Sequence, residues 1–191
     1  MSKICFALII SLFSTTLTAK SILVLGDSIS AGYGLENGKG WVTLLQQKFN
    51  NRNKSYTLFN ESISGDTTAG GLARINNALS QYKPEVVLLE LGANDGLRGL
   101  SPKLMKSNLA EIIKRSQKSG AKVLLLSMRI PPNYGKRYVD MFYRVYPQLA
   151  TEMNIPYVPF ILEDIALVKD LMQKDGLHPN AKAQPIIADK I

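Results

Sequence analysis

The sequence predicts an α/β fold, in which a parallel five-stranded sheet is covered by helices on both faces. Short apolar runs alternate along the chain with segments whose apolar residues recur at helical spacing. The central runs contain almost no polar residues, which is typical of strands buried on both faces. Polar and glycine-rich segments directly follow the first three runs. Because ligands bind beyond the carboxyl ends of the strands in such sheets, these segments are the first place to look for a functional site.

Five apolar runs are the expected strands, and stripes of apolar residues at steps of three and four are the expected helices between them. The strands cover residues 22–25, 56–59, 86–91, 123–126 and 157–158. The helices cover residues 41–49, 72–82, 105–116 and 142–153, and a last helix begins near Pro185 and ends early at Ile191. No linker or internal repeat interrupts the alternation, so residues 20–191 are expected to form one domain.

The third expected helix has residues typical of helix boundaries at both ends, and the fourth contains a proline. Ser101 can cap the third helix, Pro102 suits its first turn, and Gly120 suits its exit. Pro147 lies inside the fourth stripe, where it removes a backbone donor. We therefore expect the fourth helix to be kinked or split at this proline.

The first residues have the pattern of a secretory signal peptide. Lys3 precedes an apolar run over residues 4–13, and a small residue, Ala19, stands at the expected cleavage position. The run is much shorter than the ~20 residues that a membrane span needs. A buried strand or a retained anchor are the alternatives. We expect residues 1–19 to be removed and the mature protein to be periplasmic or secreted.

Composition and charge exclude several classes of protein. The chain of 191 residues is 46% hydrophobic and 20% charged, which is typical of a globular domain. Cys5 is the only cysteine and His178 the only histidine, so no disulfide framework and no cysteine-rich or histidine-rich metal site is expected. The net charge of +8 comes from scattered Lys and Arg without interleaved aromatic residues, so we expect no nucleic-acid partner. The positive charge can instead favour the approach of the protein to anionic lipid surfaces or anionic substrates.

The candidate site residues lie at the expected strand ends and near the end of the chain. Taken singly, Ser28 could cap a helix, Asn94 could belong to an ordinary turn, and His178 could be a surface residue. Taken together, they supply what serine-based acyl transfer needs: a nucleophile, a base, a carboxylate that orients the base, and donors for the oxyanion. Asp175 would be that carboxylate.

The spacing of Asp175 and His178 supports this combination. They are three residues apart, and Gly176 between them allows a tight turn. The carboxylate can then bond the near ring nitrogen, while the far nitrogen faces Ser28. Ser28 does not lie in a G-x-S-x-G elbow, because Ser30 occupies the fifth position, so an ordinary α/β-hydrolase loses support.

Four sequence blocks in order resemble those of the GDSL/SGNH hydrolase family. They are Gly-Asp-Ser-Ile at 26–29, Gly65, Gly-Ala-Asn-Asp at 92–95, and the pair Asp175 and His178. Ile29 stands where the family usually has leucine. Further segments, among them 62–67, 94–99 and 132–135, are similar to a periplasmic, multifunctional esterase branch of that family. The resemblance covers essentially the whole mature chain.

This resemblance implies a three-layer α/β/α sandwich of the flavodoxin-like kind. It implies Ser28 as nucleophile, His178 as general base and Asp175 as its orienting carboxylate. The implied oxyanion hole consists of the backbone N–H groups of Ser28 and Gly65 and the side-chain amide of Asn94. The implied substrates are acyl esters and thioesters, such as acyl-CoA, lysophospholipids and short aryl esters, and no metal or organic cofactor is needed. Because a histidine base must be neutral, activity is expected to fall below about pH 6–7.

The acyl chain of such a substrate needs an apolar groove. The candidates follow the fourth expected strand: Met128, Ile130, Pro131, Tyr134, Met141 and Phe142. Met141 and Phe142 could equally belong to the core. Gly96 and Leu97 lie in a glycine-rich segment that could move over a bound chain as a lid. Asp27 and Asp95 are interpreted as structural, each fixing its loop by accepting backbone N–H bonds.

Other functions remain open on the sequence alone. One is a carbohydrate O-acetyl esterase of the same superfamily. Another is a non-catalytic flavodoxin-like module, either a flavin- or carbohydrate-binding domain or a response-regulator receiver, since Asp27 and Asp95 follow the first and third strands. The expected partner is a small-molecule acyl ester, with at most transient contact with a membrane surface, and the protein is expected to be a monomer.

Overall fold

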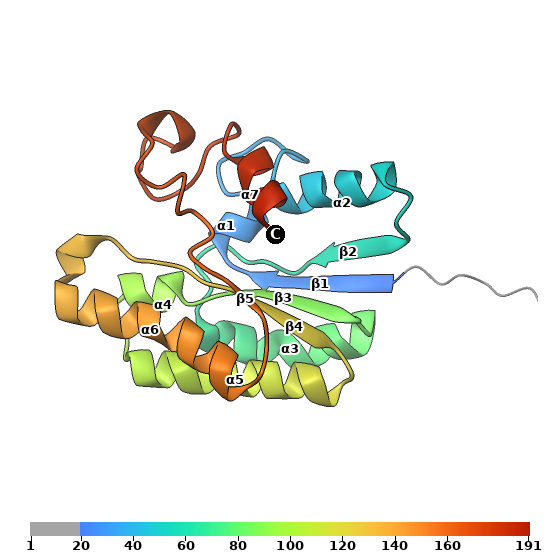
Figure 1. Ribbon diagram of the computed structural model, residues 1–191, viewed down its shortest axis with the longest axis horizontal. Coiled ribbons are helices and arrows are strands. Elements are labelled where there is room, and N and C mark those ends of the chain that lie inside the picture. The colour runs from blue at the N-terminus through green and yellow to red at the C-terminus, as the bar shows by residue number, and fades with distance from the viewer. Residues whose placement is uncertain (1–19) are drawn as a thin grey trace, which may run out of the picture.

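The computed structural model describes residues 20–191, which are built around one five-stranded sheet (Figure 1). The strands are β1 (Lys20–Gly26), β2 (Tyr56–Asn60), β3 (Val86–Glu90), β4 (Lys122–Leu126) and β5 (Tyr157–Val158). Their order in the sheet is β2-β1-β3-β4-β5, and every neighbouring pair is parallel. The predicted parallel five-stranded sheet is therefore confirmed. The expected signal peptide, residues 1–19, lies outside the described residues.

Helices cover both faces of this sheet, which confirms the predicted three layers (Figure 1). On one face, α2 (Trp41–Asn51) packs against α7 (Gln184–Lys190). On the other face, α5 (Pro102–Lys118) packs between α3 (Thr68–Tyr82) and α6 (Lys136–Glu152). Short helices follow the strand ends: α1 (Ser28–Ala31), α4 (Ala93–Leu97), and the 3-10 turns η1 (Pro132–Tyr134) and η2 (Lys169–Leu171).

The core lies on both sides of the central strands. Leu23, Val24 and Leu25 of β1 and Val87 and Leu89 of β3 are completely buried, as their continuous apolar sequence predicts. The helices supply the other walls with large buried side chains, among them Trp41, Leu109, Ile112 and Tyr146. Burial of this kind is the main favourable term in folding, and it makes the carboxyl ends of β1 and β3 a rigid base for the loops that follow.

Local structure differs from the expectation at three places. Of the two outcomes expected at Pro147, the split is wrong, because α6 runs through this residue, and the kink stays a prediction. Buried residues on both sides of Pro147, including Tyr146 and Leu149, hold the helix on the core, and this packing outweighs the lost backbone bond. Ser101 occupies the cap position of α5, but its side chain makes no cap hydrogen bond. The segment at Asn94, which could have been a plain turn, belongs to α4.

The strand order creates a topological switch point at the carboxyl ends of β1 and β3. From β1 the chain turns outward to β2 and then returns to β3 on the other side of β1. The loops after β1 and β3 therefore diverge, and this switch point is where ligands bind in open α/β sheets. It lies at the left-hand end of the sheet in Figure 1.

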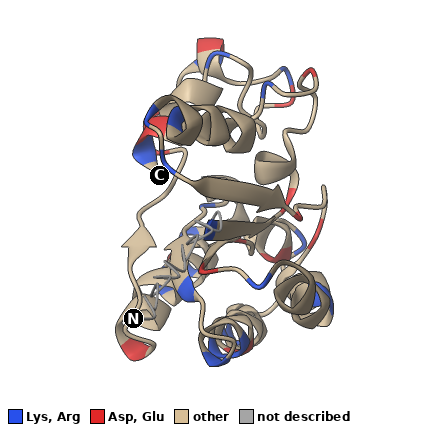
Figure 2. Cartoon of the chain, turned by 90° about the vertical axis from the view of Figure 1, so that its right-hand side faces the viewer, with Lys and Arg blue, Asp and Glu red and all other residues tan. Residues whose placement is uncertain are grey.

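Charged residues are distributed over the helices and loops. On the side that faces the viewer in Figure 2, Lys and Arg are scattered over several elements together with Asp and Glu. Among residues 20–191, no helix is both long and apolar enough to cross a membrane.

Candidate active site

Ser28, His178 and Asp175 form one hydrogen-bonded chain at the switch point. Ser28 is the first residue of α1, directly beyond β1, whereas Asp175 and His178 lie in the loop before α7. The distance from His178 Nε2 to Ser28 Oγ is 2.9 Å, and the distance from His178 Nδ1 to Asp175 Oδ2 is 2.7 Å. A hydroxyl, an imidazole and a carboxylate are thus aligned in the order that proton transfer from the hydroxyl requires.

The histidine loop is shaped by local hydrogen bonds. Asp175 Oδ1 accepts the backbone N–H groups of Leu177 and His178 at 2.9 and 3.0 Å. Gly176 between them has φ +68°, a left-handed conformation that glycine adopts without strain. The carboxylate therefore folds back onto the histidine of its own loop, as the spacing of the two residues predicted.

Gln173 ties this loop to the segment beyond α1. Its side-chain amide donates to the carbonyls of Tyr33 and Pro179 at 2.7 and 3.1 Å, and its backbone N–H donates to the carbonyl of His178 at 2.7 Å. The ring of Tyr33 lies against the ring of His178, with 4.6 Å between centroids. These contacts fix the orientation of the imidazole even though the loop is largely exposed.

The charge state of Asp175 suits its position. Its slight burial works to raise the pKa, but hydrogen bonds from the His178 ring and from two backbone N–H groups outweigh it and lower the pKa to about 2. The carboxylate is therefore ionised throughout the neutral range. An ionised carboxylate accepts a hydrogen bond from the Nδ1–H group, which holds the proton on Nδ1 and leaves Nε2 free to act as a base.

Beneath Ser28 lies a buried polar layer that begins with Asp27. Its Oδ1 accepts the backbone N–H of Ile29 at 3.0 Å and so caps α1, and its Oδ2 accepts the side-chain amide of Asn94 at 3.0 Å. The cap of this helix is therefore Asp27 and not Ser28, whose hydroxyl is left for His178. Asp95 bonds Thr68 at the start of α3, through the backbone N–H at 2.8 Å and the hydroxyl at 2.5 Å.

Glu90 completes this layer and was missed by the sequence analysis. It is fully buried at the end of β3, and its Oε2 accepts the hydroxyl of Ser30 at 2.7 Å and the backbone N–H of Asp27 at 3.3 Å. Its Oε1 has no hydrogen-bond partner within residues 20–191. A signal was available, because Glu90 is the only charged residue in the otherwise apolar run 86–91.

Burial shifts the pKa of both carboxyl groups upward. For Glu90, desolvation and the nearby Asp27 charge raise the pKa well above its ordinary value. For Asp27, desolvation raises the pKa to about 6, although the bonds from Ile29 and Asn94 and the nearby His178 oppose the shift. Two neighbouring buried carboxyls cannot both ionise cheaply, so burial and the nearby Asp27 both favour the neutral form of Glu90.

The groups expected to form the oxyanion hole are two backbone N–H groups and one side-chain amide from three different segments. The backbone N–H groups of Ser28 and Gly65 donate to no other group in the described part of the chain. Gly65 has φ +81°, and its carbonyl accepts Arg98 at 2.7 Å. The amide of Asn94 is oriented by Asp27. The two backbone N–H groups are therefore available to a ligand, and the amide of Asn94 is already held in one orientation.

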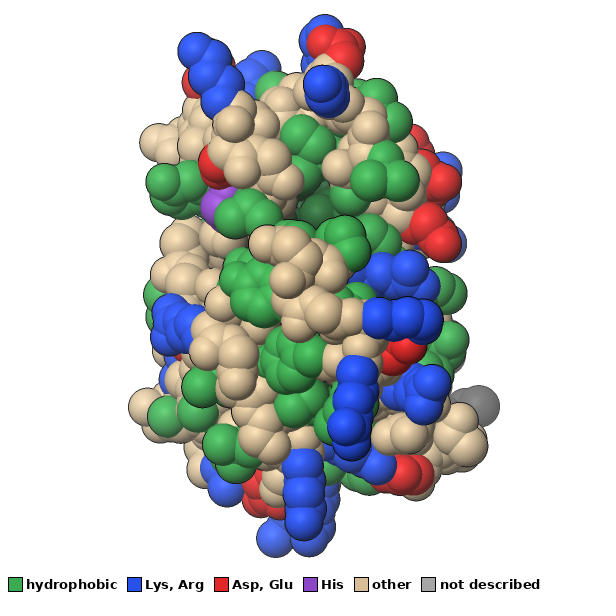
Figure 3. Space-filling model, turned by 90° about the vertical axis from the view of Figure 1, so that its left-hand side faces the viewer, with side chains coloured by type: hydrophobic (Ala, Val, Ile, Leu, Met, Phe, Trp, Pro, Cys, Tyr) green, Lys and Arg blue, Asp and Glu red, His purple; other side chains and the backbone are tan. Residues whose placement is uncertain are grey.

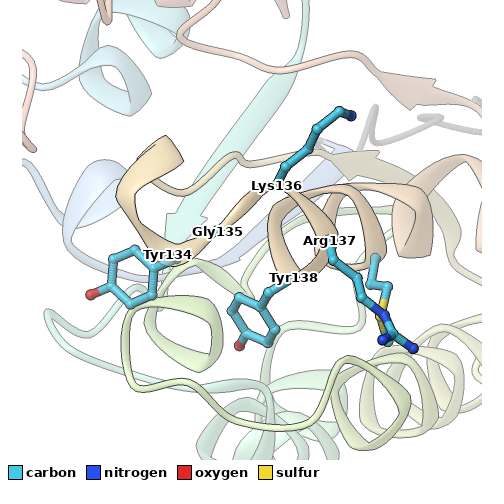
Figure 4. A pocket seen from close by; sticks show the side chains of 6 residues that line it. Tyr134, Gly135, Lys136, Arg137 and Tyr138 are labelled. Carbon is cyan, nitrogen blue, oxygen red and sulfur yellow. The ribbon is translucent and has the colours of Figure 1, made fainter.

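The residues expected to form the acyl groove separate into two sets. The first set is buried in the core and consists of Met128, Ile130 and Phe142, whereas Pro131 is half-buried. Of the two roles considered for Phe142, groove or core, the structure therefore supports the core. Tyr134 and Met141 are exposed and line an open hollow of about 560 Å³ at the start of α6 (Figure 4). Tyr138, which sequence analysis did not select, also lines it.

This hollow lies against α4 and so borders the site. Tyr134 donates to the carbonyl of Leu97 at 2.8 Å, and Tyr138 donates to the carbonyl of Leu100 at 2.7 Å. Gly96 is buried inside α4, where an added Cβ would lie 2.5 Å from Ile130 and 2.7 Å from Phe142. The absence of a side chain at Gly96 therefore serves close packing, and the lid movement expected of Gly96 and Leu97 stays a prediction.

A doubly wound α/β fold with a serine, histidine and carboxylate chain at its switch point defines a hydrolase of the serine type. A family model describes the same class: the chain belongs to the GDSL-like lipase/acylhydrolase family, whose model matches residues 24–185. The resemblance stated from the sequence blocks is therefore confirmed, and the protein is an ester hydrolase. Membership of this family overturns the receiver and binding-module alternatives.

Characterised relatives agree with this assignment. The chain is 46% identical to the esterase TesA of Pseudomonas aeruginosa over 187 residues, which cover 98% of this chain and 92% of the relative. It is 49% identical to an arylesterase of Vibrio mimicus over 171 residues, which cover 90% and 86% of the two chains. The solved structure of the esterase EstA from Pseudoalteromonas superimposes with a TM-score of 0.87 at 48% identity, covering 90% of this chain and 93% of that one.

Proposed function

We propose that the protein hydrolyses acyl esters and thioesters through an acyl-serine intermediate formed on Ser28. The observation that carries the proposal is the distance of 2.9 Å between Ser28 Oγ and His178 Nε2, with Asp175 bonded to the other ring nitrogen. Substrates are small molecules such as lysophospholipids, acyl-CoA and short aryl esters. Removal of residues 1–19 on export would place the enzyme in the periplasm.

The reaction proceeds in two balanced steps. Ser28 Oγ bonds to the acyl carbon while its proton passes to His178 Nε2. The bond from the acyl carbon to the leaving oxygen or sulfur then breaks, and the same proton passes to the leaving group. Water next gives a proton to His178, attacks the acyl-serine and releases the fatty acid, and the proton returns to Ser28 Oγ. Asp175 remains ionised and stabilises the imidazolium in both steps.

The negative charge of each tetrahedral intermediate needs donors that are already in place. The backbone N–H groups of Ser28 and Gly65 and the amide of Asn94 are assigned this role. Losing one such donor costs roughly 10²–10³ in turnover in enzymes of this kind. The hollow at the start of α6 is assigned to the acyl chain, because it borders α4 and the rings of Tyr134 and Tyr138 and the thioether of Met141 offer apolar surface. Lys136 and Arg137 also line this hollow, and their long side chains can keep the charged ends in water at its rim.

The decisive experiment replaces the nucleophile. Ser28→Ala is expected to reduce kcat on a p-nitrophenyl ester by more than about 10³-fold, because no other hydroxyl in the described range 20–191 is bonded to His178. A fluorophosphonate probe should add covalently to the wild-type protein, as seen by mass spectrometry, and not to this variant. Ser55→Ala, which removes an exposed hydroxyl just before β2, is the matched control. Substantial turnover or labelling of Ser28→Ala with an unchanged melting temperature would refute the proposal.

A further inference from the structure

A second hollow lies beside the histidine loop, and the mechanism so far gives it no role. Its volume is about 420 Å³, and it is lined by Leu167, Lys169, Met172, Gln173, Lys174 and Gly176, together with Ala166. Met172 pairs with Pro179 in an antiparallel bridge, and Gln173 bonds the carbonyl of His178. One wall of the hollow is therefore the same turn that presents Asp175 and His178 to Ser28.

The hollow carries positive charge. Lys169 and Lys174 are both exposed, and neither forms an ion pair with any residue in the range 20–191. The nearby carboxylates are already engaged, because Asp170 pairs with Lys182 at 2.8 Å and Asp175 with His178 at 2.7 Å. Blue side chains stand above the histidine on this face of the molecule in Figure 3. The two ammonium groups are thus available to an anion.

The mechanism determines which part of the substrate meets this hollow. His178 delivers its proton to the leaving group, so the leaving group must lie on the histidine side of Ser28. The acyl chain lies on the other side, toward α4 and the hollow at Tyr134. In Figure 1 the loop of η2 and the start of α6 lie on opposite sides of the sheet, and these two segments line the second and the first hollow, respectively.

We propose that Lys169 and Lys174 form a subsite for a phosphate group carried by the leaving group of the substrate. The inference rests on the proposed function, because that function places the leaving group on the histidine side of Ser28 and the acyl chain on the other side. An ammonium binds phosphate as a point charge without needing fixed geometry, which suits two exposed lysines. A lysophospholipid carries its phosphate only a glycerol away from the ester oxygen, whereas in acyl-CoA the whole pantetheine arm intervenes. Both substrates carry an anionic phosphate in the leaving group, which is the group that the subsite would bind.

The test compares phosphate-bearing and neutral leaving groups at constant acyl chain. The substrates are monomeric lysophosphatidylglycerol, the matching acyl-CoA and the matching monoacylglycerol, each assayed at low and high salt. The double variant Lys169→Ala, Lys174→Ala is compared with Lys54→Ala, which removes an exposed lysine at the other edge of the sheet. We expect the ratio of kcat/KM for a phosphate substrate to that for monoacylglycerol to fall roughly three- to tenfold in the double variant, and the loss to shrink at high salt.

The outcomes separate the subsite from the proposed function. A fall in the ratio for lysophosphatidylglycerol alone identifies a lipid headgroup, and a fall for acyl-CoA alone identifies the nucleotide carrier. If the kcat/KM ratio of both phosphate substrates to monoacylglycerol stays unchanged in the double variant, the subsite is overturned while hydrolysis by Ser28 stands. An equal loss of activity on all three substrates leaves the ratio unchanged and counts as this outcome. If the proposed function itself were wrong, Ser28→Ala would retain its activity on monoacylglycerol, which no change at Lys169 or Lys174 can mimic.

Discussion

The layer beneath Ser28 and the loop that carries His178 hold their carboxyl groups in opposite ways. Asp27 and Glu90 are fully buried between β1 and β3, and they bond backbone and side-chain donors from several elements. Asp175 sits in an exposed turn and bonds only its own loop. One region is rigid because it is part of the core, and the other because a short set of local bonds and Gln173 hold it.

The difference shows how the same functional group is adapted to two tasks. Burial raises the pKa of Asp27 to about 6, whereas hydrogen bonds overcome slight burial and lower the pKa of Asp175 to about 2. The carboxylate that must remain charged during the reaction is therefore the exposed one. The buried pair supports the start of α1, where Ser28 lies, and Asp27 also bonds the side chain of Asn94.

Replacing the charged carboxylate should have the largest effect. In Asp175→Asn the amide nitrogen can face His178 Nδ1, which favours the tautomer that carries its proton on Nε2 and cannot accept the proton of Ser28. We expect kcat to fall roughly 10²–10⁴-fold with little change in melting temperature. Asp189→Asn, an exposed carboxylate on α7, is the control. A loss of less than tenfold in Asp175→Asn would contradict the role assigned to this carboxylate.

The corresponding change in the buried layer should have a smaller effect. In Asp27→Asn an NH₂ group replaces the carboxylate oxygen that accepts the hydrogen bond from the Asn94 amide. The Asn94 side chain then loses the contact that orients it as an oxyanion donor. We expect kcat to fall roughly tenfold to a hundredfold, with KM nearly unchanged, because the donor is needed only in the transition state. Steady-state kinetics on a p-nitrophenyl ester measure the split. A rise in KM with kcat unchanged would show that Asp27 acts on substrate binding instead.

Much of the architecture could be predicted because it depends on strong, local patterns. Continuous apolar runs identify strands buried on both faces, and the run at 86–91 became β3 with one residue fewer. The turn at Asp175 and His178 could be anticipated because both partners lie within one short segment. The split considered at Pro147 does not occur for a tertiary reason, since packing of α6 on the core outweighs local propensity.

The parts that escaped prediction depend on contacts between distant segments. Glu90 bonds Ser30 and Asp27, which lie about sixty residues earlier in the chain, so nothing near Glu90 shows what its carboxyl group does. The hollow at Lys169 and Lys174 likewise needs the turn of the histidine loop to exist. Periodicity indicates that a residue is buried or exposed, but not which distant polar group it meets.

The smallest of the three effects tests whether Glu90 is a neutral acid. The unfolded chain loses the proton of this residue near its ordinary pKa of 4.5, whereas the folded protein keeps it to much higher pH. Since the folded state then binds more protons, this group lowers the free energy of unfolding as pH rises above 4.5. Glutamine has the shape of the neutral acid and does not titrate, so Glu90→Gln escapes this loss.

We therefore expect the stability of Glu90→Gln, relative to the wild type, to increase with pH. Between pH 4.5 and pH 6 the gain is on the order of 1 kcal/mol, measured by urea unfolding at each pH. Glu111→Gln is the matched control, because Arg115 lowers the pKa of that partly exposed carboxyl, and its relative stability should not rise with pH. A difference between Glu90→Gln and the wild type that stays constant over this range would mean that Glu90 is ionised in the folded protein. In that case the buried layer and the histidine loop would both use charged carboxylates, and the contrast between them would be one of position alone.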